Sequence, residues 1–293
     1  MANNLGRIPL PGRVRELDRM YGIIEKEIKK ELLLSDIGNY QETKTVKTQE
    51  KIDKLIKMLN RSAMKWSKAA VPEAYDSGYE VAKTRLEILG AEKSEEFPEK
   101  THEQMIEIET NKMVDVLIAA DLSIKTNVAM YLYLVRQASW GLAQIQEFDF
   151  RDEEFIAGLL DDAIRAGETR GYAKRLVMDY LRDEVGEGKF IQIRGKNYNM
   201  SKYADLVAKT RLRTVQTEAV LNSCKQYEND LVEVSNHGTR CTICMPYEGN
   251  VYSLSGKHPV YPLLDSYPPW HPRCQHSIRP TSETALEWRQ EHA

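Results

Sequence analysis

Apolar side chains recur at steps of three and four residues through most of the first 185 positions, which is the spacing of one helical face. The clearest stripe runs through residues 13–34 and consists of Val14, Leu17, Tyr21, Ile24, Ile28 and Leu32. The same spacing predicts helices over residues 48–70, 72–90, 103–120, 123–146, 152–166 and 171–185. Pro72 fits the first turn of its helix, because its missing N–H costs nothing there. Short connections between these helices favour antiparallel packing in an elongated bundle.

The pattern changes at Gly186-Glu187-Gly188. Residues 190–193 alternate as a half-buried strand does, and residues 195–197 provide a turn. A helix is predicted over residues 202–223, followed by a strand over 230–234 and a strand-like piece over 250–254. We therefore predict a predominantly helical α+β protein, with a helical bundle over residues 1–185 and a small α+β module over 186–293.

The composition is that of a soluble globular protein, with 42% hydrophobic and 29% charged residues and only 16 Gly and 11 Pro. This excludes collagen-like and wholly disordered chains. No apolar run approaches the roughly 18–20 residues of a membrane span. The N-terminus lacks the apolar core of a signal peptide. We therefore expect the protein to avoid membranes and to stay in a reducing cytoplasm.

A short basic segment is embedded in an acidic protein. Residues 1–185 carry 28 basic and 33 acidic side chains, whereas residues 186–229 carry 8 basic and 4 acidic ones. A nucleic-acid-binding module would use the basic side chains of residues 189–213, namely Arg194, Lys196, Lys202, Lys209, Arg211 and Arg213. A solvated helix face explains the same charges, and we favour that interpretation.

Four cysteines in a reducing compartment indicate thiols or metal ligands instead of disulfides. Cys241 and Cys244 form a C-x2-C pair, and after 26 intervening residues come His271, Cys274 and His276. Thiolates and imidazoles at such spacing suit tetrahedral zinc, and a small loop-rich unit gains much of its folding free energy from a metal. We predict a structural zinc site in which five candidates compete for four positions.

Other interpretations of these residues are weaker. A thioredoxin-like redox pair needs a helix after the cysteines, which Pro246 and Gly249 disfavour. Simple burial is a further alternative, and it is our prediction for Cys224. A catalytic zinc needs an open position and a carboxylate base, and the spacing singles out neither Glu248 nor Asp265. We predict no enzyme activity, with a zinc-dependent hydrolase or nuclease as the alternative.

Two stretches resemble the phage minor head proteins, a family similar to the F protein of phage Mu and to the minor capsid proteins of tailed phages. In residues 190–213, the run Lys202-Tyr-Ala-Asp-Leu-Val-Ala-Lys-Thr210 resembles a tyrosine-led helix that ends in a basic-Thr pair. In residues 231–280, the motifs follow in the family's order: Glu233-Val-Ser-Asn-His-Gly, Cys241-x2-Cys244, Tyr247-Glu-Gly-Asn-Val-Tyr-Ser and His271-Pro-Arg-Cys274-Gln-His276. Family members commonly end in HPNCRC or NCRHS, so the resemblance leaves open whether His271 or His276 completes a metal site.

The resemblance implies a low-copy virion component that acts in head morphogenesis. Such a protein associates with the portal protein at the portal vertex and with other head and scaffold proteins, and it is taken into the procapsid. DNA contact, ejection with the DNA and copy number stay open. A helical region that engages the portal and head, followed by an F-like C-terminal module, is the organisation that the resemblance implies.

Overall fold

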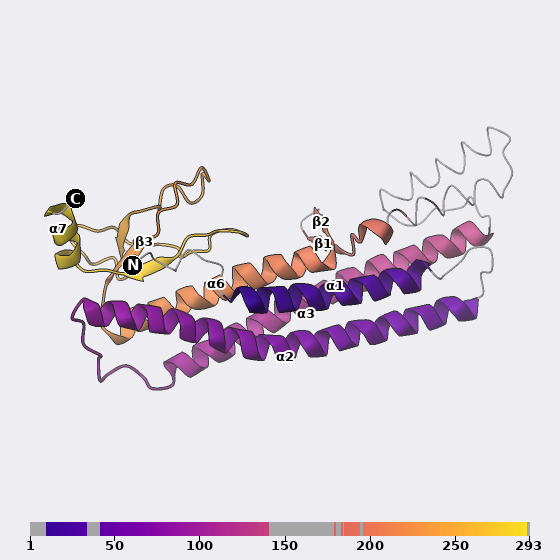
Figure 1. Ribbon diagram of the computed structural model, residues 1–293, viewed down its shortest axis with the longest axis horizontal. Coiled ribbons are helices and arrows are strands. Elements are labelled where there is room, and N and C mark those ends of the chain that lie inside the picture. The colour runs from indigo at the N-terminus through magenta and orange to yellow at the C-terminus, as the bar shows by residue number, and fades with distance from the viewer. Residues whose placement is uncertain are drawn as a thin grey trace. The chain divides into compact units, whose positions relative to one another are not determined.

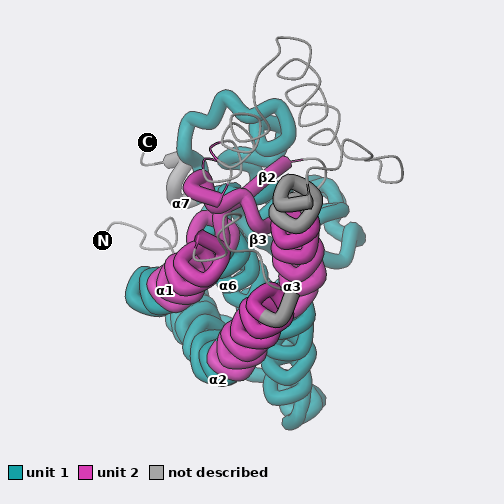
Figure 2. The backbone as a smooth tube through the Cα atoms, turned by 90° about the vertical axis from the view of Figure 1, so that its right-hand side faces the viewer, with its two compact units in different colours: residues 1–17, 63–116, 204–293 teal, residues 18–62, 117–203 magenta. Residues whose placement is uncertain are grey.

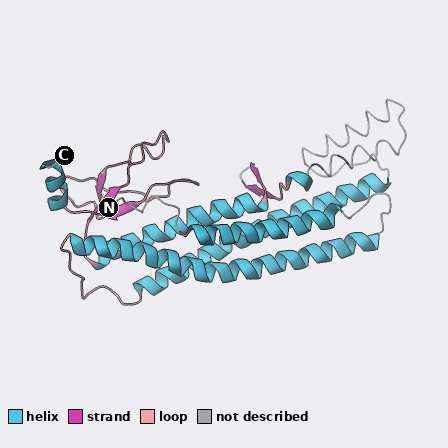
Figure 3. Cartoon of the chain, viewed as in Figure 1, coloured by secondary structure: helices cyan, strands magenta, loops and turns pink. Residues whose placement is uncertain are grey.

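The structure is a computed structural model that describes residues 10–33, 42–140, 179, 183, 185–193 and 196–291. Helices dominate it (Figures 1 and 3), with two small antiparallel sheets beside them. The long helices are α1 (Pro11–Leu33), α2 (Glu42–Ile88), α3 (Thr101–Trp140) and α6 (Met200–Gln226). The predicted fold class, predominantly helical α+β, is confirmed. Within the described ranges, none of the helices is long and apolar enough to cross a lipid bilayer.

Among the described residues the predicted helices exist, but two predicted breaks are wrong. Helix α2 continues through Pro72, and α3 continues through the predicted gap between residues 120 and 123. A proline inside a helix removes one backbone hydrogen bond. Val71 and Ala74, on either side of Pro72, are fully buried, so packing holds the helix together across that loss. The helix predicted over 152–166, and most of the one over 171–185, lie outside the described residues.

The chain divides into two compact units (Figure 2). Unit 1 comprises Met1–Leu17, Ala63–Val116 and Ala204–Ala293, and unit 2 comprises Asp18–Ser62 and Leu117–Tyr203. Each of the four long helices contributes residues to both units.

Unit 2 is built on the apolar stripes of its helices. Its fully buried side chains include Tyr21, Ile28, Leu32, Ile52, Ile56, Leu117 and Ile124. A two-stranded sheet of β1 (Ile191–Ile193) and β2 (Lys196–Tyr198) precedes α6. The buried carboxylate of Glu25 accepts the N–H of Met200 at 2.9 Å, where α6 begins. A carboxylate at a helix N-terminus accepts a hydrogen bond from a backbone N–H that has no acceptor within the helix, and its negative charge interacts favourably with the positive end of the helix dipole.

Unit 1 contains a three-stranded sheet in which β3 (Leu231–Val234) lies between β4 (Val251–Ser253) and β5 (Ile278–Pro280). The core under this sheet joins strands, loop and helices, with Ala82, Val220, Leu221, Cys224, Val232, Val234, Tyr252, Leu264 and Ile278. The buried state predicted for Cys224 is confirmed, and burial raises the pKa of its thiol to about 12. Strand β5 and helix α7 (Glu283–Glu291) were not predicted, and the turn predicted over residues 195–197 is wrong for residues 196 and 197, which pair with β1 as part of β2.

Helices α2 and α6 approach closely within unit 1. A Cβ atom added to Gly78 would lie 2.8 Å from the backbone oxygen of Gln216 and 3.0 Å from the Cβ of Ala219. Glycine at position 78 is therefore required for this contact. Helices α2 and α6 pack against the three-stranded sheet. The loops that contain the cysteines connect the strands of that sheet.

Candidate metal centre

Cys241 and Cys244 lie in a tight turn after strand β3. The backbone N–H groups of Cys244 and Met245 donate to the carbonyl of Cys241 at 3.1 and 2.9 Å. The backbone N–H groups of Cys244 and Ile243 lower the pKa of the Cys241 thiol, which favours the thiolate, the form that binds metals. The turn therefore presents one activated thiol and a second thiol three residues later.

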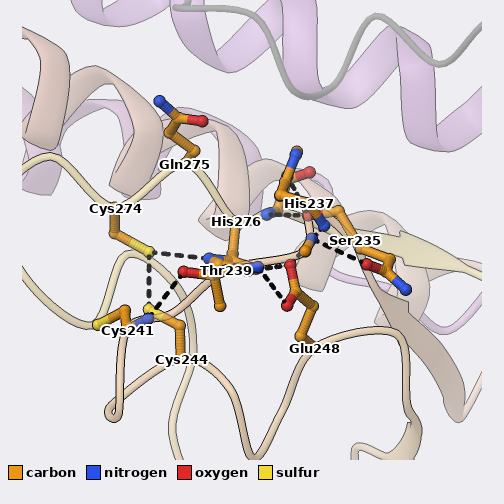
Figure 4. A network of polar contacts seen from close by, with 12 residues as sticks. Ser235, His237, Thr239, Cys241, Cys244, Glu248, Cys274, Gln275 and His276 are labelled. Atoms are coloured by element: carbon orange, nitrogen blue, oxygen red, sulfur yellow. Dashed lines mark hydrogen bonds and ion pairs between the residues drawn. The ribbon is translucent and has the colours of Figure 1, made fainter.

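The second group of ligand candidates lies on a turn between β4 and β5. The N–H of Cys274 donates to the carbonyl of His271 at 3.0 Å, and Arg273 between them has a φ of 67°. The side chains of Cys274 and His276 are buried, whereas His271 is half-buried. This turn places a thiol and two imidazoles against the first cysteine pair, and Figure 4 shows Cys274 and His276 beside Cys244.

The separations between these groups match a tetrahedral site. With metal–sulfur bonds of about 2.3 Å and metal–nitrogen bonds of about 2.0 Å, tetrahedral angles place two sulfurs about 3.8 Å apart, and a sulfur and a nitrogen about 3.5 Å apart. The Sγ atoms of Cys244 and Cys274 are 3.8 Å apart. The Sγ of Cys274 is 3.6 Å from Nδ1 of His276. Cys244, Cys274 and His276 therefore have the separations of three ligands of one metal ion.

His271 approaches the cysteine pair with its outer nitrogen. Its Nε2 lies 3.4 Å from Sγ of Cys241 and 3.0 Å from Sγ of Cys244. Its Nδ1 lies 2.8 Å from the carbonyl of Pro272, so an Nδ1–H donor leaves the Nε2 lone pair aimed at the thiols. His271 is thus oriented as a ligand.

His276 is oriented as a ligand by a carboxylate. Its Nε2 lies 3.2 Å from Oε1 of Glu248, which leaves Nδ1 directed at Cys274 (Figure 4). Glu248 also accepts the backbone N–H of His237 and, at 2.9 Å, that of Thr239. Burial tends to raise the pKa of Glu248, but these donors and His276 outweigh it and lower the pKa. A carboxylate that fixes a metal-binding imidazole is a common outer partner in metal sites.

The donors form two overlapping groups that share Cys244. Cys241, Cys244 and His271 make one group, and Cys244, Cys274 and His276 make the other. Burial, followed by the neighbouring Cys274, raises the pKa of Cys244 to about 12. A bound cation would reverse this effect, because a coordinating thiol loses its proton. The chemistry of the donor set therefore fits a metal, with His271 and His276 both placed to complete it.

The structure also shows how the remaining polar residues of this region are engaged. His237 packs its ring edge-on against His276, with centroids 5.0 Å apart, and contacts Ser235 Oγ at 2.9 Å. Asp265 accepts the hydroxyl of Tyr247 at 3.2 Å. The carboxylate of Glu248, which the sequence offered as one of two possible bases, contacts His276. No feature of the spacing indicated this contact, because it joins residues 28 positions apart on separate loops.

The basic residues predicted for nucleic-acid binding have different environments. Lys196 and Lys202 are exposed, and Arg194 lies outside the described residues. Lys209 pairs with Asp205 at 2.7 Å, and Arg211 pairs at 2.6 Å with Glu109, which is only 1% exposed. Arg213 is buried and donates to the carbonyl of Gln275 at 3.0 Å. The five described residues of this set therefore do not form one common basic surface.

Comparison with protein families gives one finding. Residues 173–281 match the family described as Phage minor capsid protein 2. The matched segment includes α6, all three strands of the β4–β3–β5 sheet and every candidate ligand. The resemblance to phage minor capsid proteins is thus confirmed for this part of the chain. No curated protein and no solved structure matches the chain.

Proposed function

We propose that this chain is a minor capsid protein of a tailed phage, a structural part of the head. The observation that carries the proposal is the family match over residues 173–281. The match covers the same helix, sheet and Cys/His cluster that the sequence motifs single out. A fold does not establish a function. The assignment to the phage head therefore depends on the matched segment and on the Cys/His cluster within it.

The proposed metal is zinc, in a structural site. Cys241, Cys244 and Cys274 would provide three thiolates, and either His271 or His276 the fourth ligand. Thiolate-rich, closed tetrahedral sites of this kind are typical of structural zinc. When bound, the ion would supply folding free energy by joining two loops that have few strand hydrogen bonds of their own.

The proposed place of action is the portal vertex. Residues 1–185 would provide the surface that meets the portal protein and other head or scaffold proteins, and residues 186–293 would be the F-like module. Helices of 47 and 40 residues offer extended faces for protein partners. The protein would be present in the virion and, during assembly, in the host cytoplasm.

The proposed role is non-catalytic. A catalytic zinc keeps an open position beside a base. Here the nearest carboxylate, Glu248, already accepts two backbone N–H groups and contacts His276. This arrangement supports a positioning role for Glu248 and a closed centre.

Head particles assembled with a Cys274→Ser variant test the proposal. We expect reduced incorporation of the protein and lower infectivity, because the loss of one thiolate opens the centre. Cys224→Ala is the matched control, since it removes a buried thiol outside the Cys/His cluster. Band intensity per purified head, infectious titre and zinc content are the measurements. Wild-type titres from heads that contain zinc-free variant would refute a structural role for the site.

A further inference from the structure

A cavity of about 330 Å³ with several charged side chains in its wall lies beside the Cys/His cluster within unit 1. Helix α6 lines it with Asp205, Lys209, Thr210 and Arg213, and the turn before β5 adds Arg273 together with Cys274 and Gln275. Three cationic side chains thus face one carboxylate. The size is in the range of small-ligand sites, about 300–1,000 Å³.

Contacts within the protein hold two of the cationic groups at the cavity wall, and the third comes from a separate segment. Arg213 is only 4% exposed, and its Nη1 donates to the carbonyl of Gln275 at 3.0 Å. Lys209 is held by Asp205 at 2.7 Å. Arg273 belongs to a separate segment, the turn before β5, and has a positive φ, a backbone conformation that side chains adopt at a cost and that often occurs at functional sites. Two of the three cationic groups of the cavity are therefore held in place before a ligand binds.

We propose that this cavity binds a phosphate group. Guanidinium groups donate paired hydrogen bonds to phosphate oxygens, and lysine adds a point charge. Donors from both sides suit a tetrahedral oxyanion, whose oxygens point in several directions. A planar carboxylate has only two oxygens, so it accepts hydrogen bonds from fewer of these donors. The group is either free phosphate or a phosphodiester of nucleic acid. This binding site is additional to the structural role proposed above.

Calorimetric titration of the purified full chain with inorganic phosphate tests the proposal. We expect Arg273→Gln to raise the phosphate Kd about tenfold or more, because a charge-assisted hydrogen bond is lost. Asp205→Asn should lower the Kd, because it removes the carboxylate that repels the ligand. Lys225→Gln is the control, an equal change of charge on an exposed residue of α6 outside the cavity. The metal content of each variant shows that the neighbouring centre is intact.

The opposite signs for positions 273 and 205 are the decisive result, because a general loss of stability would not produce them. A short DNA duplex that competes with phosphate identifies a phosphodiester as the ligand, and absence of competition identifies free phosphate. The proposal is wrong if phosphate gives no binding, if Arg273→Gln and Lys225→Gln behave alike, or if glutarate binds as tightly as phosphate.

Discussion

Unit 2 and the C-terminal part of unit 1 are stabilised in different ways. In unit 2, long helices bury a regular series of large apolar side chains, such as Tyr21, Ile56 and Ile124. Residues 230–281 contain three strands of only three or four residues, separated by long loops. These loops are tied by individual contacts, among them those of Glu248 and of the cysteines. In unit 2 the stability is therefore distributed over many buried apolar side chains, whereas the loops depend for theirs on a few individual contacts.

The difference has a physical basis. Full burial of one large aliphatic side chain contributes about 1.5–3 kcal/mol, and the helices of unit 2 repeat this contribution along their length. The apolar cluster beneath the three-stranded sheet draws Ala82, Val220 and Cys224 from the helices. The cysteine-bearing loops extend beyond that cluster. We therefore expect the metal to contribute more to this region than any single apolar contact does.

The largest effect should follow metal removal. Chelation, or Cys244→Ser, should unfold the loops and strands of residues 230–281 and leave unit 2 folded, because structural zinc contributes about 10–16 kcal/mol of apparent binding free energy. Hydrogen exchange should show lost protection in β3 and β4 and retained protection in α1. Far-UV circular dichroism should lose only a small part of the helical signal.

Cys224→Ala should retain the metal and the exchange pattern, which separates loss of a ligand from loss of a thiol. If α1 loses its protection in the same transition, the two regions unfold as one cooperative unit. The division that we predict at residue 186 would then be wrong as a stability boundary.

The same contrast explains what could be predicted from the sequence. The stripe from Val14 to Leu32 identifies α1 because a helical period is repeated over several turns. Strand β5 (Ile278–Pro280) was missed, because it is short and contains Pro280, which cannot donate a hydrogen bond to a sheet and so argues against a strand. Pro72 misled the prediction, because a local rule about backbone hydrogen bonds ignores the burial on both sides of it.

The metal centre shows the same limit. The spacing identified the donor types and their two clusters, because two residues that are separated by two others in a tight turn can reach one ion. It did not identify Glu248 as the partner of His276, because that contact depends on how two loops close. It also left His271 and His276 as alternatives, and the folded chain brings both to the thiols.

The second prediction concerns the helix pair that carries the sheet. Gly78→Ala should destabilise the protein by about 1–3 kcal/mol, because a Cβ there would overlap the backbone of α6. Alanine normally stabilises a helix interior relative to glycine by about 1 kcal/mol. Gly22→Ala in α1 is the control, since its nearest neighbour is Ser201 Cβ at 3.8 Å. Urea unfolding should give opposite signs for the two variants, and a gain from Gly78→Ala would contradict the close approach.

The third prediction tests the contacts that surround the metal. Glu248→Gln should weaken zinc affinity about 10- to 100-fold, as loss of an outer partner of a ligand does. Asp265→Asn is the control, because Asp265 contacts Tyr247 and lies outside the Cys/His cluster. Competition with a chromophoric chelator measures the affinity. In the same assay, the greater loss between His271→Ala and His276→Ala identifies the fourth ligand. Equal affinities for the Glu248 and Asp265 variants would remove the positioning role of Glu248.

The smallest effect should come from a polar pair buried in unit 2. Asn60 donates to Asp121, which is 7% exposed. Their two Oδ1 atoms are buried, and among the described residues neither has a hydrogen-bond partner. Both atoms are acceptors when Asp121 is ionised, and a proton on the carboxyl group gives Asp121 a hydrogen-bond donor that the ionised form lacks. Burial raises the pKa of Asp121, although Asn60 and Lys125 act in the opposite direction.

Because this pKa is higher in the folded protein than in the unfolded chain, the stability that the proton contributes is fully present below about pH 3.9, and it is lost as pH rises through the folded-state pKa. Asp121→Asn replaces that proton by an amide donor at every pH. It should therefore raise stability at pH 7 by about 1 kcal/mol, the worth of one hydrogen bond, and the gain should shrink as the pH falls. Thermal unfolding across pH measures the difference, with Asp115→Asn as the exposed control on α3. A gain that stays constant with pH would show that the ionised carboxylate of Asp121 has no unfavourable contribution in the fold.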